Sequence, residues 1–200
     1  MNPTYPTITI DLVLDRLTAK EALRAVLHSV LFHRLFGTVK EQSHEVLDVT
    51  MPGIDDPEMK QLIEEKVDAF WKGIEGGISK RGQIIVTFSE KRPRKTWFIM
   101  GEEEIPWEQW YAYGLRASCH LTFGGNCRII NAEMRQPVQD KDRQIFNGEL
   151  ASVLTKSLET MLNYASSERG RSAVPIITNA NGISPFPIKI TVKIKGVEVG

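Results

Sequence analysis

The sequence predicts an α+β fold, a single domain in which three main helices pack on a mainly antiparallel sheet. Three segments repeat apolar residues at helical spacing, and several shorter segments alternate apolar and polar residues. No linker long enough to divide the chain occurs in its 200 residues. Because a domain normally holds roughly 100–200 residues, we expect residues 1–200 to form one domain.

The first two predicted elements are a strand and a central helix. Residues 7–14 place apolar side chains at every second position, which is the period of a half-buried strand. Thr18 and Glu21 match a capping box that would open a helix, and Gly37 is expected to close it. This helix is apolar on almost every side, so we expect it to lie at the centre of the domain.

The middle of the chain predicts a strand, a helix and a second strand. We expect the first strand near residues 45–50 and a helix that begins at Pro57. Residues 83–89 have a continuous apolar centre, which is typical of a buried strand. A charged connection, residues 90–96, should then lead to the apolar residues 97–100.

The last part of the chain predicts a hairpin, a long helix and a closing strand. Residues 111–123 hold the longest two-residue alternation, and Gly124-Gly125-Asn126 should turn it toward a partner strand near residues 128–132. A third helix is expected from about residue 142 to 165, followed by a polar loop that runs to residue 173. Residues 188–194 predict a strand with one wet face.

The composition excludes several classes of protein. The chain holds 25 Lys plus Arg and 25 Asp plus Glu, so its formal net charge is zero. This zero net charge excludes a protein that coats nucleic acid, because such a protein needs a broad basic face. A neutral domain also tends to associate, so we expect a protein partner. Two cysteines, Cys119 and Cys127, are too few for a disulfide framework and indicate a reducing compartment. We expect no signal peptide and no transmembrane helix, which would need about 20 consecutive apolar residues.

The sequence predicts no catalytic, metal or cofactor site. His44-Glu45 begins like a zinc-protease motif, but the second histidine is missing. His28 and His33 are five residues apart, which separates them by about 140° on a helix and prevents shared ligation. Cys119, Cys127 and the nearby His120 are too few for a four-ligand zinc site. We therefore expect a protein that is not an enzyme.

Two features are unusual for a plain globular domain. The basic run Lys91–Lys95 is followed by Trp97 and Phe98, and each such ring buries on the order of 150–250 Å² when it is covered. Either one ring packs in the core while the other covers a sheet edge, or the rings anchor a protein or membrane partner. The second feature is His33-Arg34 at the end of an apolar helix. Either the helix dipole favours two cations in its last turn, or these residues make a polar contact at an interface.

Four segments give the chain a family resemblance. Residues 26–34, V-L-H-S-V-L-F-H-R, resemble the V-L-H-x-V-L-x-H-R segment of the autophagy-related protein 101 family. Residues 104–110, E-I-P-W-E-Q-W, resemble its I-P-W-E-x-W motif, which also follows a basic stretch and an aromatic tip. The segments at 142–145 and 185–190 fall in the same order, so the resemblance spans nearly the whole chain.

The resemblance implies a HORMA domain with a scaffolding role. It implies a non-enzymatic subunit of the autophagy-initiation kinase complex, in the cytoplasm at the preautophagosomal structure. Its implied partner is the HORMA domain of autophagy-related protein 13, which it stabilises, and an exposed aromatic finger recruits downstream autophagy factors. The resemblance implies no cofactor and no nucleic acid, and any contact with a membrane would be indirect.

Five residues become candidates for partner binding. His33 and Arg34 match family positions on the helix end that faces the partner. The family tip reads Trp-Pro-Phe, whereas Trp97 and Phe98 are adjacent in this chain, and counting back from Ile-Pro-Trp puts Phe98 and Met100 at the two anchor positions. The alternative hypothesis is a peripheral membrane adaptor in which Lys91–Lys95 accompany Trp97 and Phe98 as interfacial anchors.

Overall fold

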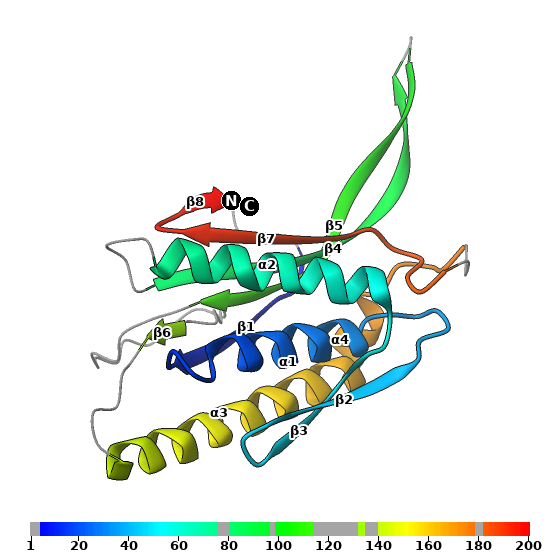
Figure 1. Ribbon diagram of the computed structural model, residues 1–200. Helices are drawn as coiled ribbons and strands as arrows, with labels where there is room; N and C mark the ends of the chain where they lie inside the picture. Colours follow the sequence, from blue (N-terminus) through cyan, green and yellow to red (C-terminus); the bar gives the residue numbers. More distant parts are fainter. Residues whose placement is uncertain (1–4, 76–80, 97–98, 114–131, 135–139, 179–181) are drawn as a thin grey trace, which may run out of the picture.

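Three long helices and a mainly antiparallel sheet form the body of the protein, as the sequence predicts (Figure 1). The computed structural model describes residues 5–75, 81–96, 99–113, 132–134, 140–178 and 182–200. The long helices are α1 (Ala19–Phe32), α2 (Pro57–Glu75) and α3 (Asp140–Ser166), and a short α4 (Glu168–Ser172) follows α3.

The strands form one large sheet and one separate hairpin. The large sheet holds β1 (Thr7–Leu14), β4 (Arg81–Thr96), β5 (Ile99–Tyr113), β6 (Ala132–Met134), β7 (Ile188–Ile194) and β8 (Val197–Val199). The hairpin consists of β2 (Glu41–Val46) and β3 (Val49–Ile54).

Strand β5 lies between β1 and β4, and β6 continues its line. β1 runs parallel to β5, whereas β4 pairs antiparallel with β5 on one side and with β7 on the other. Tyr113 of β5 lies opposite Gln83, and Ala132 of β6 lies opposite the adjacent Gly82. The two segments therefore occupy consecutive positions of one ladder.

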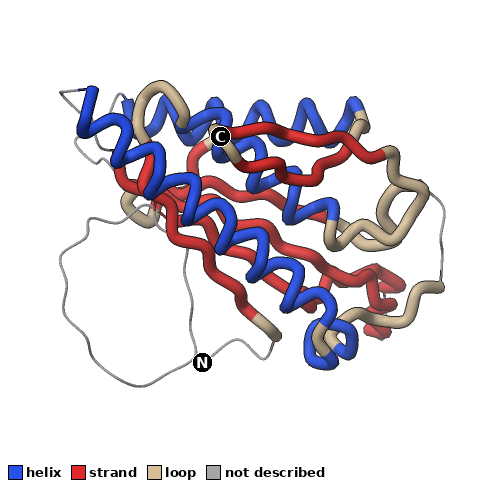
Figure 2. Tube along the Cα trace, turned by 90° about the horizontal axis from the view of Figure 1, so that it is seen from below, coloured by secondary structure: helices blue, strands red, loops and turns tan. Residues whose placement is uncertain are grey.

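Helix α1 is central, as predicted. It lies between α2 and α3 and also contacts the β2–β3 hairpin, and most of its residues are buried (Figures 1 and 2). Its start differs from the predicted capping box: the side chain of Thr18 makes no capping bond, and Asp15 Oδ1 accepts the Thr18 backbone N–H at 2.8 Å. The helix ends at Phe32, so Gly37 does not close it. A side chain at position 37 would collide with the Gly182 carbonyl oxygen, which explains the glycine there.

Two predicted segments have different structures for identifiable reasons. Residues 45–50 are not one strand, because Leu47 adopts a left-handed φ of 55° and forms the turn between β2 and β3. The polar segment 166–173 is not all loop, because Ser167 caps α4 by accepting the Gly170 N–H. The Leu47-Asp48 turn contains neither the Gly nor the Asn that normally indicates a tight turn in a sequence.

The long alternation of residues 111–123 falls mostly outside the described residues. Its first three residues belong to β5, and of the predicted partner strand near 128–132 only Ala132 is described, in β6. The predicted strand at 188–194 is confirmed as β7. The helix predicted at 142–165 is confirmed as α3, with two more residues at its start and one at its end.

A pair of histidines joins the β2–β3 hairpin to α1. The ring centroids of His28 and His44 are 4.3 Å apart, and His28 Nδ1 accepts the Ile54 backbone N–H at 3.4 Å. Burial, followed by the nearby His44 and Lys60, lowers the pKa of His28 to about 4. Burial also lowers the pKa of His44, so both rings are neutral at pH 7.

Acidification is expected to destabilise the domain before its carboxylates titrate. A histidine whose pKa is lowered by folding binds fewer protons in the folded state, so the free energy of unfolding falls as pH drops below about 6.5. His28 alone should remove up to about 3 kcal/mol between pH 7 and pH 4. Urea denaturation at pH 7.0, 6.0 and 5.0 measures this, with His28→Gln as the control that keeps an acceptor for Ile54. Equal losses of stability in both proteins would contradict the assignment.

Candidate protein-interaction site

The hairpin of β4 and β5 projects beyond the body of the domain (Figure 1). We call residues 89–96 and 99–106 the finger. Pairing between β4 and β7 ends at Phe88, and β1 pairs with β5 only from Gln109 onward. In the described part of the chain, the finger strands therefore pair only with each other, up to Thr96 opposite Ile99.

The finger is a strand pair with opposite charges on its two strands. Lys91 lies opposite Glu104 and Arg92 opposite Glu103, and these side chains are exposed. Lys91 Nζ lies 3.5 Å from a Glu102 carboxylate oxygen, and Arg92 pairs with Glu90. The prediction that residues 90–96 form a connection is wrong, because cross-strand pairs of opposite charge stabilise a strand without any apolar alternation.

Three of the predicted contact residues, Trp97, Phe98 and Met100, lie in the sequence where β4 leads into β5. Trp97 and Phe98 lie outside the described residues. Met100 is the second residue of β5 and pairs with Lys95, and its side chain is likewise outside the described part. The backbone register nevertheless fixes where the two strands meet, because Thr96 and Ile99 face each other on either side of residues 97–98. The roles of these three residues in binding stay predictions.

His33 caps the C-terminal end of α1 at the surface of the body. Its ring is half-buried, and Nδ1 donates to the Ser29 carbonyl oxygen at 2.7 Å. Burial lowers the pKa of His33, so this ring is neutral at pH 7. The ring also makes an edge-on contact with Phe32. Its neutrality differs from the dipole-favoured cation that the sequence suggested.

Arg34 is inside the domain, where it forms a bidentate ion pair with Glu108 of β5. The two contacts are Nε–Oε1 at 2.7 Å and Nη2–Oε2 at 2.8 Å, and the side chains are 2% and 0% exposed. Arg34 Nη2 also donates to the Gly170 carbonyl oxygen of α4 at 3.2 Å. Because its guanidinium is covered by its own chain, we do not retain Arg34 as a direct contact of a partner.

Glu108 is held from a second side by aromatic residues. Trp110 Nε1 donates to Glu108 Oε1 at 2.6 Å, and the Trp110 ring packs edge-on against Tyr164 of α3. Arg34 lies 5.1 Å from the centre of the Tyr164 ring, within range of a cation–π contact. Burial and the charge of Glu108 raise the pKa of Tyr164, so its phenol stays neutral. Glu108 therefore connects β5 to Arg34, which follows α1, and through Arg34 and Trp110 to Tyr164 near the end of α3.

The finger leaves the body at a β-bulge. The register shifts so that Phe88 faces Glu108 while Ser89 faces Pro106, which leaves Trp107 as the extra residue of β5. Trp107 is buried and packs against Phe88 and Phe186, and its indole nitrogen has no hydrogen-bond partner among the described residues. We call residues 106–109 the root of the finger.

The structure connects two predicted sites through residues that the prediction missed. Arg34 was predicted on the helix end and the aromatic tip after the charged segment 90–96, and in the structure Glu108 at the root lies between Arg34 and the finger. The sequence did carry a signal, because Glu108 is the one charged residue among Ile105, Pro106, Trp107 and Trp110. A charge at such a position needs a buried partner, and Arg34 follows directly after the apolar helix α1 and its cap His33. Neither Tyr164 nor Gly170 had a comparable signal.

These features define the class of protein: an α+β domain with a compact body and a projecting two-stranded hairpin. The chain belongs to the autophagy-related protein 101 family, whose model matches residues 11–181. It is 38% identical over 104 residues to autophagy-related protein 101 of Schizosaccharomyces pombe, covering 52% of this chain and 56% of that protein. It is 30% identical over 103 residues to the Arabidopsis thaliana protein of the same name, covering 50% and 48%.

Family membership confirms the resemblance read from the sequence and gives the protein a role in autophagy. The chain spans about half the length of the curated relatives it matches. Within the described residues, no helix is long and apolar enough to cross a membrane. No group of three or more His, Cys, Asp or Glu side chains in that part of the chain could hold a metal ion.

Proposed function

We propose that residues 1–200 form a HORMA domain that acts as a non-enzymatic scaffold subunit of the autophagy-initiation kinase complex. The body binds and stabilises the HORMA domain of autophagy-related protein 13, and the finger recruits downstream autophagy factors through Trp97, Phe98 and Met100. The protein works in the cytoplasm, at the preautophagosomal structure. Family membership supports the role in autophagy. The observation that carries the two-surface arrangement is the projecting finger, whose strands have no other strand to pair with among the described residues.

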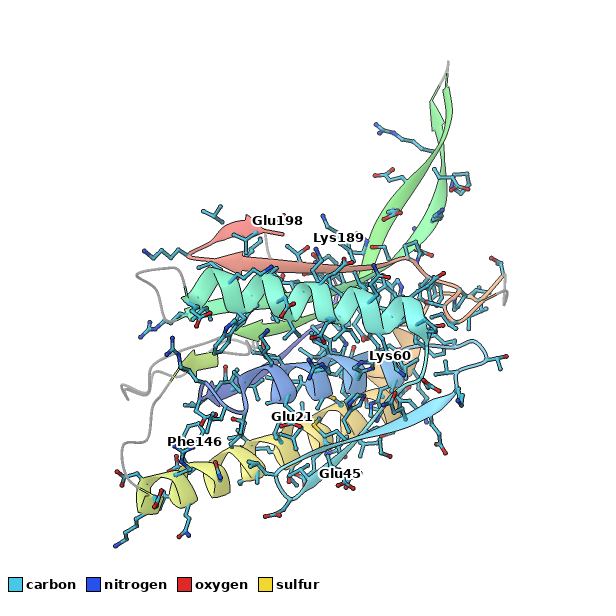
Figure 3. The ribbon with its side chains drawn as sticks, viewed as in Figure 1. Glu21, Glu45, Lys60, Phe146, Lys189 and Glu198 are labelled. Carbon is cyan, nitrogen blue, oxygen red and sulfur yellow. The ribbon has the colours of Figure 1, made fainter. Side chains whose placement is uncertain are left out.

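The geometry of the finger supports recruitment by its tip. The described finger strands extend away from the helices as far as Thr96 and Ile99, and the side chains drawn along the hairpin stand clear of the body (Figure 3). Lys91 and Glu102 retain 56% and 68% exposure, so charge keeps the stem in water. Large aromatic residues at the end of such a stem suit a partner that covers them, since buried aromatics dominate interface energies.

The body also presents apolar surface that suits a protein partner. Ile145 and Leu162 of α3 are 55% and 49% exposed, and Ile176 beyond α4 is 89% exposed. A chain of zero net charge with such residues at its surface tends to associate. We expect the melting temperature to rise when the HORMA partner is added, because only the folded state binds it.

The membrane-adaptor alternative has less support. Lys91–Lys95 contains four cations, but Glu102–Glu104 places three carboxylates on the adjacent strand. The attraction of an anionic lipid surface for the finger is therefore largely cancelled by its own carboxylates. Sedimentation with anionic vesicles tests the alternative, and strong binding by the isolated chain would favour it.

His33→Asp is expected to weaken the heterodimer while the isolated domain stays folded. His33 lies at the surface end of α1, and a carboxylate there introduces an unpaired charge into the proposed interface. We expect the dissociation constant to rise about tenfold or more, as for other buried charges left unpaired at an interface. Isothermal titration calorimetry measures it, with Gln61→Asp on the exposed face of α2 as the matched control. An unchanged affinity, or a loss of folding, would remove His33 from the interface.

A further inference from the structure

The direction of the finger depends on its root. Beyond Phe88 and Gln109 the described finger strands pair with no other strand, so the finger is a two-stranded lever attached at one end. Two-stranded ribbons twist and bend more readily than strands within a sheet. Whatever fixes residues 106–109 therefore sets the direction in which the described finger strands leave the body.

The root contains the one register shift between β4 and β5. Trp107 is the extra residue, and bulges of this kind bend the strand and change the direction in which it continues. Packing of Trp107 against Phe88 and Phe186 holds the bulge from one side. Glu108, the next residue, is held from the other side by Arg34 and Trp110.

The ion pair suits positioning better than stabilisation. Charges as fully buried as Arg34 and Glu108 lose their hydration, and replacing such a pair with uncharged residues of similar size is often neutral for stability. The pair does provide directional contacts, because a guanidinium fork meets a carboxylate in one plane. Those contacts connect the root to α1 and, through Gly170, to α4. A side chain at Gly170 would collide with the Tyr164 carbonyl oxygen, so the approach of α4 is specific as well.

We propose that Arg34 is a positioning residue that acts through Glu108 to set the direction in which the finger leaves the body. The finger tip is thereby presented at a fixed place relative to the helices. The consequence for recruitment rests on the function proposed above, whereas the consequence for finger direction is a property of the domain alone. Arg34 thus contributes to binding without touching the partner.

Spin-label distances test the direction of the finger without reference to any partner. One nitroxide is placed at Glu103→Cys on the finger and one at Lys72→Cys on α2, both exposed, with Cys119 and Cys127 replaced by serine. In this background, Arg34→Met with Glu108→Gln removes both buried charges and keeps an acceptor for Trp110. We expect the distance distribution to broaden about twofold or to shift, because several finger directions become populated.

A matched control separates positioning from the general loss of an ion pair. Arg24 and Glu64 form the same bidentate contact, at 2.7 Å for both bonds, between α1 and α2. Arg24→Met with Glu64→Gln should leave the distribution unchanged. A distribution with the same width and the same mean distance in the Arg34–Glu108 double variant as in this control would overturn the proposal.

A conservative variant keeps the test decisive if the double variant does not fold. Arg34→Lys retains the charge but not the fork, so the distribution should broaden to an intermediate extent. A width equal to that of the unmodified domain would overturn the proposal. Autophagic flux in cells gives the functional arm: if the tip variant Trp97→Ala with Phe98→Ala supports normal flux, the proposed function fails. The broadening caused by Arg34→Met with Glu108→Gln would still hold in that case.

Discussion

Arg34→Met is expected to lower the free energy of unfolding by about 3–5 kcal/mol, because Glu108 would stay buried without its counter-ion. The Glu108 carboxylate would keep the Trp110 N–H as a donor, and the Gly170 carbonyl oxygen would lose the Arg34 guanidinium. Since whole domains are stable by only about 5–15 kcal/mol, this is a large fraction of the total. Urea denaturation of the purified variant measures the loss directly.

The Arg24–Glu64 ion pair of α1 provides the comparison. Arg24 contacts Glu64 in the same bidentate geometry, but their side chains are 32% and 46% exposed. Arg24→Met should therefore cost no more than about 1 kcal/mol, as exposed pairs usually do. Adding Glu108→Gln to Arg34→Met should restore most of the lost stability, since no buried charge is then left unpaired. Equal losses in the Arg24 and Arg34 variants would contradict the burial of the Arg34–Glu108 pair.

The second large effect concerns the tip of the finger. Trp97→Ala with Phe98→Ala should abolish recruitment of downstream autophagy factors and leave both folding and the heterodimer intact. Aromatic residues at an interface centre often contribute 2 kcal/mol or more each, roughly, so losing two removes most of the binding. The measurements are thermal melting of the heterodimer and autophagic flux in cells that carry the variant.

Two outcomes would overturn the assignment of the tip. Truncating a core aromatic costs about 3–5 kcal/mol, so a melting temperature lowered by tens of degrees would show that the rings belong to the core. Normal flux with an intact fold would show that they recruit nothing. Lys91→Ala provides a control on the exposed stem of the finger, where neither the fold nor recruitment should change.

The sequence predicted the body of the fold because burial follows periodicity there. Residues 7–14 alternate and form β1, and the three apolar stripes form α1, α2 and α3. The resemblance implied an aromatic finger, but its strands were missed because residues 90–96 and 99–105 pair through opposite charges, which gives no apolar alternation. The β2–β3 turn was missed because it uses Leu47 in a left-handed conformation that the sequence does not indicate.

The candidate site could be predicted only in part, since its connection depends on tertiary structure. The family resemblance pointed to His33, Arg34 and the aromatic tip, residues that are far apart in the sequence. The contact of Arg34 with Glu108 spans 74 residues, and no local pattern encodes such a pairing. The bulge at Trp107 depends likewise on the packing of Phe88 and Phe186 around it. The sequence signal for the contact between Arg34 and Glu108 was that each charge lies next to apolar residues and therefore needs a buried partner.

Calorimetric titration of the HORMA domain of autophagy-related protein 13 into this chain tests the central proposal most directly. We predict a one-to-one complex with the same affinity for the unmodified chain and for the variant Trp97→Ala with Phe98→Ala, because binding belongs to the body and recruitment to the finger. We also predict that His33→Asp weakens the complex. Absence of binding by the folded, unmodified chain, or equal loss of binding in the tip variant, would contradict the account.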